Sequence, residues 1–131
     1  MVLKSNLLPP GNSEKTGNLI VTDMANAKQK SECPIAAMLV LIGGKWKPVI
    51  LYFLTSGTRR FGEIAVRIPT ISRKVLTEQL KELEKDGLIM RERYKEIPPR
   101  VEYSLTDLGK SLSSVFHEMS MWGKKYVLAK R

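Results

Sequence analysis

Between residues 71 and 106 the chain carries a helical repeat followed directly by two strand repeats, and few folds accommodate that succession. Segment 71–86 places its apolar side chains along one helical stripe, formed by Val75, Leu76, Leu80 and Leu83. Capping residues frame this helix: Ser72 or Thr70 at its start and Gly87 at its end. Segments 88–94 and 100–106 then alternate, and Pro98-Pro99 between them predicts a hairpin with a stiff tip.

Further helices are expected on both sides of this unit, at 35–42, 46–54, 61–68 and, after the cap residue Thr106, at 107–128. The first of them is apolar on every face, which is typical of a helix buried in the core or in a subunit interface. This order of elements is that of a winged helix-turn-helix domain. The predicted fold class is therefore mainly α (α+β), with a two-stranded wing and extra N- and C-terminal helices that dimerise.

Almost all of the net positive charge lies in residues 33–131, the part of the chain that is expected to fold. Residues 1–32 show no sustained repeat, so we expect a flexible N-terminal arm before one DNA-binding and dimerisation domain at 33–131. The chain has 22 Lys and Arg against 13 Asp and Glu, a net charge of +9. The arm holds four Lys against three acidic residues, so +8 remains for the domain. Such an excess favours a polyanion as the partner, either nucleic acid or an anionic membrane surface.

The composition also argues against several classes of protein. One Cys and one His leave no intramolecular disulfide and no Cys/His zinc site, and we expect no metal and no cofactor. No Ser-His-Asp set or carboxylate pair stands out, so we expect no enzymatic activity. The longest apolar run has eight residues, whereas a membrane-spanning helix needs about 20. With no apolar signal peptide at its start, the chain is expected to be a soluble cytoplasmic protein without a place in the membrane.

The helix at 71–86 presents short polar and cationic side chains opposite its leucine stripe. Side chains of this kind reach base edges and phosphates when the N-terminal end of a recognition helix enters the major groove of double-stranded DNA. Other cations precede this helix or lie on the hairpin. The candidate DNA-binding residues are Arg59, Arg60, Ser72, Arg73, Lys74, Thr77, Lys81, Arg93, Lys95 and Arg100. The alternative is a solvated helix face and a hairpin edge that charge protects from aggregation.

The last helix carries apolar residues spaced alternately by four and three, which is the pattern of a coiled-coil seam. Packing on the winged core is the alternative explanation of this seam. The helix at 35–42 also needs a cover that one small domain scarcely provides, so we expect a homodimer. The candidate interface residues are Ile35, Leu39, Ile42, Leu112, Val115, Met119, Trp122 and Tyr126.

Cys33 directly precedes Pro34 at a predicted helix start. A helix N-terminus favours the thiolate, the reactive form of cysteine, and nearby lysines add to that effect. Two interpretations stay open: a thiol that senses oxidants, or a small apolar residue that is buried and inert.

Two stretches resemble the HxlR-type, MarR-like transcription regulators: Gly43-Gly44-Lys45-Trp46-Lys47 and Pro98-Pro99-Arg100-Val101-Glu102-Tyr103-Ser104-Leu105-Thr106. The resemblance covers residues 33 to about 125. It implies a winged helix-turn-helix fold and homodimers that bind palindromic operators. It also implies that a cysteine at the position of Cys33 senses oxidants or electrophiles in several members.

The leading hypothesis is a sequence-specific DNA-binding transcriptional regulator that acts as a homodimeric repressor and responds to oxidants or electrophiles through Cys33. One alternative is a regulator whose small-molecule inducer lodges at the dimer interface, next to the DNA-binding core. The other is a winged-helix module that binds proteins and has an incidental basic surface.

Overall fold

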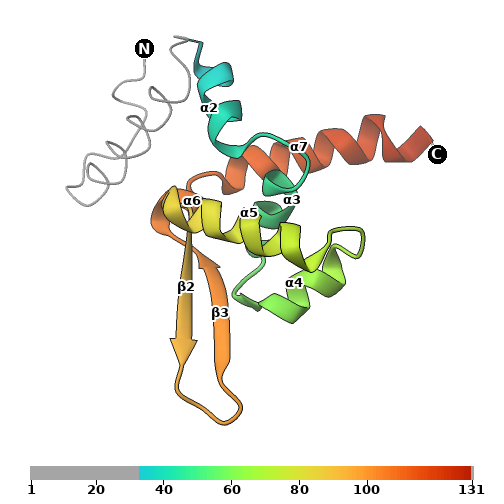
Figure 1. The fold of residues 1–131 in the computed structure, drawn as a ribbon. Coiled ribbons are helices and arrows are strands. Elements are labelled where there is room, and N and C mark those ends of the chain that lie inside the picture. Colours follow the sequence, from blue (N-terminus) through green and yellow to red (C-terminus); the bar gives the residue numbers. More distant parts are fainter. Residues whose placement is uncertain (1–32, 131) are drawn as a thin grey trace.

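The computed structural model describes residues 33–130, and the predicted arm at 1–32 lies outside the described residues. The elements follow in the order α2 (Pro34–Ile42), α3 (Lys47–Leu54), β1 (Arg59–Arg60), α4 (Phe61–Arg67), α5 (Arg73–Lys85), β2 (Ile89–Tyr94), β3 (Arg100–Leu105), α6 (Asp107–Lys110), α7 (Ser113–Tyr126) and η1 (Leu128–Lys130). Figure 1 labels the α-helices and the two long strands. No single described helix is long and apolar enough to cross a membrane. Only α2 and α3 together reach that length and composition, and they are bent by 83° where they meet.

α4 and α5 form the predicted helix-turn-helix. At the start of α4 the Arg60 backbone N–H donates to Oε1 of Glu63 at 2.8 Å. Residues 68–72 turn the chain, and the Ile71 N–H donates to the Ile68 carbonyl at 3.2 Å. This closed turn sets the direction in which α5 leaves α4.

α5 begins at Arg73, two residues later than the stripe predicts, because Ser72 occupies the cap position. The Ser72 Oγ accepts a hydrogen bond from the Val75 N–H at 3.1 Å, which satisfies one of the unpaired donors of the first turn. Past the other end, Gly87 has φ +79°, a conformation that glycine adopts without strain.

The core is a cluster of leucine and isoleucine side chains contributed by α2, α3, α4, α5 and the strands, together with Tyr103 of β3 and Phe116 of α7. Burying each such side chain stabilises the fold by roughly 1.5–3 kcal/mol. The most completely buried are Ile50, Leu51, Ile64, Leu76, Leu80, Leu83, Leu88 and Ile89. Because the leucine stripe of α5 faces this cluster, the opposite side of α5 lies at the surface.

The strands form an antiparallel sheet in the order β1-β3-β2. β2 and β3 pair from Ile89↔Leu105 to Tyr94↔Arg100, which confirms the predicted hairpin, and this wing projects from the body of the molecule (Figure 1). β1 is a third strand that the sequence pattern misses, since two residues are too few to show an alternation. It places Arg59 opposite Tyr103 of β3.

The predicted continuous helix at 107–128 is wrong, because the chain turns between α6 and α7. Thr106 caps α6 as predicted: its Oγ1 accepts from the Gly109 N–H at 3.0 Å and donates to the Gly87 carbonyl at 2.6 Å. Gly109 lies so close to Leu88 that a Cβ there would collide with the Leu88 carbonyl. The Leu112 N–H then donates to the Gly109 carbonyl at 3.1 Å, and this bond between residues three apart closes a tighter turn than an α-helix has. α6 is thus held against the sheet, and α7 starts afresh after the turn.

Candidate nucleic-acid interface

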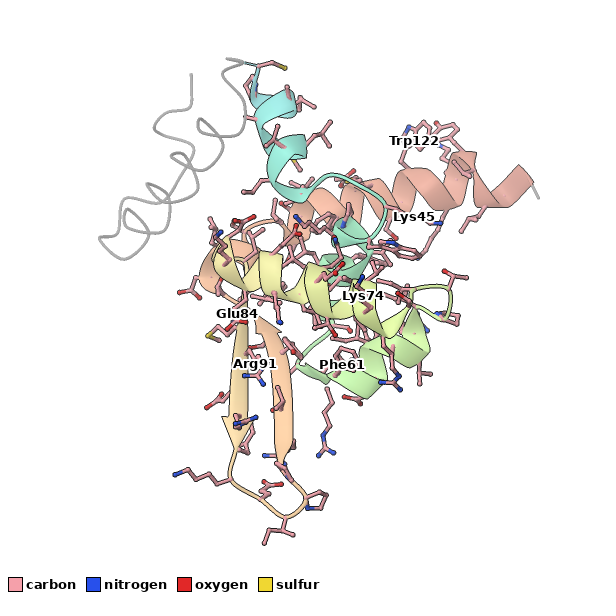
Figure 2. The ribbon with its side chains drawn as sticks, viewed as in Figure 1. Lys45, Phe61, Lys74, Glu84, Arg91 and Trp122 are labelled. Carbon is pink, nitrogen blue, oxygen red and sulfur yellow. The ribbon has the colours of Figure 1, made fainter. Side chains whose placement is uncertain are left out.

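The exposed face of α5 carries positive charge at its leading end. Arg73, Lys74 and Lys81 are exposed and Thr77 is half-buried, whereas the leucine stripe on the opposite side is buried. The first turn of α5 contains no acidic residue. Figure 2 shows Lys74 on this part of the helix. The helix dipole is positive at the same end, so charge and backbone both favour an anion there.

Arg73 is positioned by an aromatic ring of α4. Its guanidinium carbon lies 5.5 Å from the centre of the Phe61 ring, which Figure 2 labels on the neighbouring helix. A stacked guanidinium keeps N–H donors along its edge, where a phosphate or a base can accept from them. The Thr77 hydroxyl donates to the Arg73 carbonyl at 2.8 Å, which leaves its oxygen as an acceptor. The sequence pattern does not indicate this role of Phe61.

A buried lysine fixes the trailing half of α5. Lys47, the first residue of α3, is 8% exposed, and its Nζ lies 2.7 Å from Oε1 of Glu82 on α5. This ion pair neutralises one of the carboxylates that would otherwise repel a phosphate backbone, and it links α5 to α3. It is the one buried cation among the described residues, and no spacing in the sequence points to it.

The wing adds a row of exposed cations. Arg93 lies on β2 and Lys95 in the loop after it, and both are exposed. Arg91, labelled on β2 in Figure 2, is exposed as well and lies two residues before Arg93, so the two arginines share one face of the strand. These side chains carry no ion pair with a described carboxylate. They remain candidates for contacts with a phosphate backbone.

Arg100 is held inside the wing, contrary to its expected role at the DNA. Its Nη2 lies 3.1 Å from Glu96 Oε2, its Nε lies 3.3 Å from Glu102 Oε2, and its guanidinium carbon lies 4.1 Å from the centre of the Tyr94 ring. Because two carboxylates already neutralise it, a phosphate would have to displace them. We therefore do not retain Arg100 among the direct contacts.

The pKa of the Tyr94 hydroxyl, beside Arg100, is raised above its usual value. Burial contributes most, followed by the negative charge of Glu92, to whose Oε1 the hydroxyl donates at 3.3 Å. The hydroxyl therefore stays protonated and neutral at physiological pH. It serves as a fixed part of the wing.

Arg59 and Arg60 point to different sides of β1, as successive residues of a strand do. Arg59 donates to the Ser56 Oγ at 3.0 Å and to the Thr58 carbonyl at 3.1 Å, and it lies over the Phe53 ring of α3. Its donors are thus turned toward α3, and we separate it from the α5 face. Arg60 is exposed at the start of α4 and remains a candidate contact.

A second surface is apolar and belongs to α2 and α7, which lie at the end of the molecule away from the wing tip (Figure 1). Its members are exposed by between 37% (Val115) and 62% (Ile35). The predicted interface residues that lie on it are Ile35, Leu39, Val115, Met119, Trp122 and Tyr126. Ile42 is corrected: it is 2% exposed and belongs to the core of its own chain. Leu112 is half-buried against the same core and stays a candidate interface residue. Met121, Val127 and Leu128, which the seam does not include, are exposed as well.

An apolar groove of about 470 Å³ separates α7 from α3 and adjoins this surface. Tyr52 and Val49 of α3 line one side, and Phe116 and Met119 of α7 line the other.

Cys33 is exposed and stands at the cap position of α2, with no side-chain cap hydrogen bond. The buried alternative for this residue is therefore wrong. Whether the thiol reacts stays a prediction.

Known proteins resemble the chain over most of its length. The HxlR-like helix-turn-helix family matches residues 41–131. The HTH-type transcriptional regulator YdeP of Bacillus subtilis (strain 168) is 51% identical over 94 residues, which are 72% of this chain and 73% of that protein.

Solved structures share the fold as well as the sequence. The redox regulator HypR in its oxidized form is 44% identical with a TM-score of 0.68, and the match covers 71% of this chain and 96% of that one. The quinone-bound YodB from B. subtilis is 38% identical with a TM-score of 0.59, over 72% of this chain and 99% of that one.

Proposed function

Because the chain belongs to the HxlR-like helix-turn-helix family and is a transcriptional regulator, we propose that it binds a palindromic operator as a homodimer and represses transcription in the cytoplasm. The observation that carries the proposal is the leading end of α5, where exposed cations stand opposite a buried leucine stripe. A helix built in this way enters the major groove with its N-terminal end first. Bound across a promoter, such a dimer blocks access to it.

The contacts divide between base reading and backbone binding. Arg73, Lys74 and Thr77 lie in the first two turns of α5, and we assign them to base edges and the nearest phosphates. Lys81 follows one turn later. Arg60 and the exposed cations of the wing flank the helix and are assigned to the phosphate backbone, which supplies affinity without sequence information.

The apolar surface of α2 and α7 supports the homodimer. Val115, Met119, Trp122 and Tyr126 follow one another at spacings of four, three and four and are all exposed, as a coiled-coil seam without its partner would be. Large exposed apolar patches on soluble domains mark interfaces. A two-fold dimer presents its two recognition helices to half-sites about 34–36 Å apart, and its symmetry requires a palindrome.

Cys33 supports a response to oxidants or electrophiles. Its thiol is exposed at the start of α2, the helix that carries Ile35 and Leu39 of the proposed interface. Modification there would alter how the two chains pack and therefore how their recognition helices are spaced. The similar proteins HypR, named a redox regulator, and YodB, solved with a bound quinone, favour this proposal.

The test is selection of genomic fragments on the purified protein, followed by titration of the selected duplex in fluorescence anisotropy. Lys74→Gln is expected to weaken binding by about tenfold or more, the value of one hydrogen bond from a charged group. Lys110→Gln removes the same charge from an exposed lysine of α6 and is the matched control. Equal losses in both variants, or a wild type that retains no duplex, would refute the proposal and favour the protein-binding module.

A further inference from the structure

We propose that the hollow between α3 and α4 binds a small organic carboxylate between Arg59 and Arg67. This anion site has a volume of about 560 Å³, and its walls include Val49, Tyr52, Phe53, Ser56 and the two arginines. A smaller hollow of about 450 Å³, lined mainly by α4, shares Phe53 and both arginines. None of the described residues that line either hollow comes from α5, β2 or β3, so the site is separate from the recognition face.

The charge of the site is positive and uncompensated. The guanidinium carbons of Arg59 and Arg67 lie 5.2 Å and 5.7 Å from the centre of the same Phe53 ring. Neither arginine forms an ion pair with a described carboxylate, and no acidic residue lines the larger hollow. Two cations held at one ring repel each other until an anion lies between them. A carboxylate matches the planar fork of each guanidinium.

The site is partly preorganised for that anion. Ser56 and the Thr58 carbonyl hold the Arg59 guanidinium through hydrogen bonds of 3.0 Å and 3.1 Å. Arg67, exposed at the end of α4, has no such restraint from another described residue and is free to close on a ligand. One anchored and one adjustable arginine form a clamp.

The walls select an organic acid over an inorganic ion. Val49, Phe53 and the ring of Tyr52 offer apolar surface, and the volume lies within the range of about 300–1,000 Å³ that small-molecule pockets occupy. Phosphate or chloride would fill only a fraction of it. In the smaller hollow the carboxylate of Glu63 repels an anion, which places the ligand on the α3 side.

The site adjoins both the helix-turn-helix and α7, the helix of the proposed dimer surface. Arg67 belongs to α4 of the helix-turn-helix, and the hydroxyls of Tyr52 and Ser120 on α7 lie 3.0 Å apart in a hydrogen bond. A ligand that packs against Tyr52 therefore meets the helix of the proposed dimer surface as well. An effect of the ligand on operator binding rests on the proposed function, whereas binding of the ligand itself does not.

Isothermal titration of the full chain with benzoate and with benzamide, its neutral isostere, tests the site. We expect saturable binding of benzoate with one site per chain, and binding of benzamide weaker by about tenfold or more, because the charged hydrogen bonds are lost. Arg67→Gln should weaken benzoate by a similar factor. Lys110→Gln, which removes one charge far along the chain, should not.

Three results overturn the proposal: no saturable binding of benzoate, equal binding of benzamide, or equal effects of Arg67→Gln and Lys110→Gln. A parallel titration with duplex separates the site from a DNA contact. If Arg67→Gln weakens duplex binding as Lys74→Gln does while benzoate fails to bind, the arginines serve the phosphate backbone. Because benzoate binding is measured without DNA, its failure leaves the proposed function standing.

Discussion

Replacing Glu82 by Gln should destabilise the fold more than its exposed position on α5 suggests. Its carboxylate lies 2.7 Å from the Lys47 ammonium, and the two side chains are 56% and 9% exposed, respectively. Removal of the partner from a buried charge costs about 3–5 kcal/mol, whereas a fully exposed ion pair contributes about 0–1 kcal/mol. Since only the lysine is buried, we expect the free energy of unfolding to fall by about 2 kcal/mol, between these limits.

Replacing the lysine of this ion pair should destabilise the fold less than replacing the glutamate. Lys47→Met keeps most of the buried methylene chain and removes the charge that needs a partner, and water solvates the carboxylate of Glu82 that remains. We expect a loss below about 1 kcal/mol, because an apolar residue of similar volume replaces a buried charge without penalty in many proteins. Glu78→Gln is the matched control: it lies on the same helix, is exposed and forms no ion pair with a described residue, so its effect should stay within about 0.5 kcal/mol.

Urea unfolding followed by circular dichroism at pH 7 measures all three variants. The protein concentration must be identical in each series, because the stability of the proposed dimer would depend on it. The reasoning is refuted if Glu82→Gln costs no more than Glu78→Gln, or if Lys47→Met is the most destabilising of the three.

Other predictions concern DNA, assembly and the thiol. Arg73→Ala should weaken binding to the operator more than to a scrambled duplex, by about 1–3 kcal/mol of discrimination, and equal losses in the two titrations would exclude base reading. Arg100→Gln should leave the salt dependence of binding unchanged because its guanidinium is already paired, whereas Lys95→Gln should lower the slope by about 0.9; a reversed order would contradict the pairing of Arg100 with Glu96 and Glu102. Trp122→Ala should raise the dissociation constant of the homodimer at least about 30-fold in sedimentation experiments, and an unaffected dimer would place the interface elsewhere. Oxidant or quinone should change operator affinity in the wild type and not in Cys33→Ser, with mass spectrometry of the thiol as the check.

Most helices and the hairpin could be predicted because each has a local signature. The stripe of α5, its cap at Ser72 and the glycine after it lie within one short segment. β1 and the break before α7 could not be predicted, since they depend on contacts with segments distant in the sequence. β1 becomes a strand only by pairing with β3, and α6 is docked where Thr106 meets the carbonyl of Gly87.

Within the candidate site, sequence reasoning could count the cations but could not pair them. Arg100 belongs among the exposed cations of the wing by composition, yet Glu96, Glu102 and the Tyr94 ring hold it. Glu96 lies four residues before Arg100 and Glu102 two residues after it, and these short spacings are the local hints of that pairing. The contact between Lys47 and Glu82 has no such hint, because α3 and α5 meet only in the folded chain.

α3 connects the surfaces on which regulation depends in this proposal. At its start Lys47 is paired with Glu82 of the recognition helix, and in its second half Tyr52 is hydrogen-bonded to Ser120 of α7. Next to Tyr52, the Phe53 ring contacts both arginines of the proposed anion site. Because close-packed interiors have low compressibility and transmit strain, we expect a displacement of one neighbour of α3 to reach the others through this helix. One base contact is worth about 1–3 kcal/mol. A shift that breaks a single contact in each half-site would therefore change operator affinity by more than about tenfold, with no unfolding and no movement of the wing.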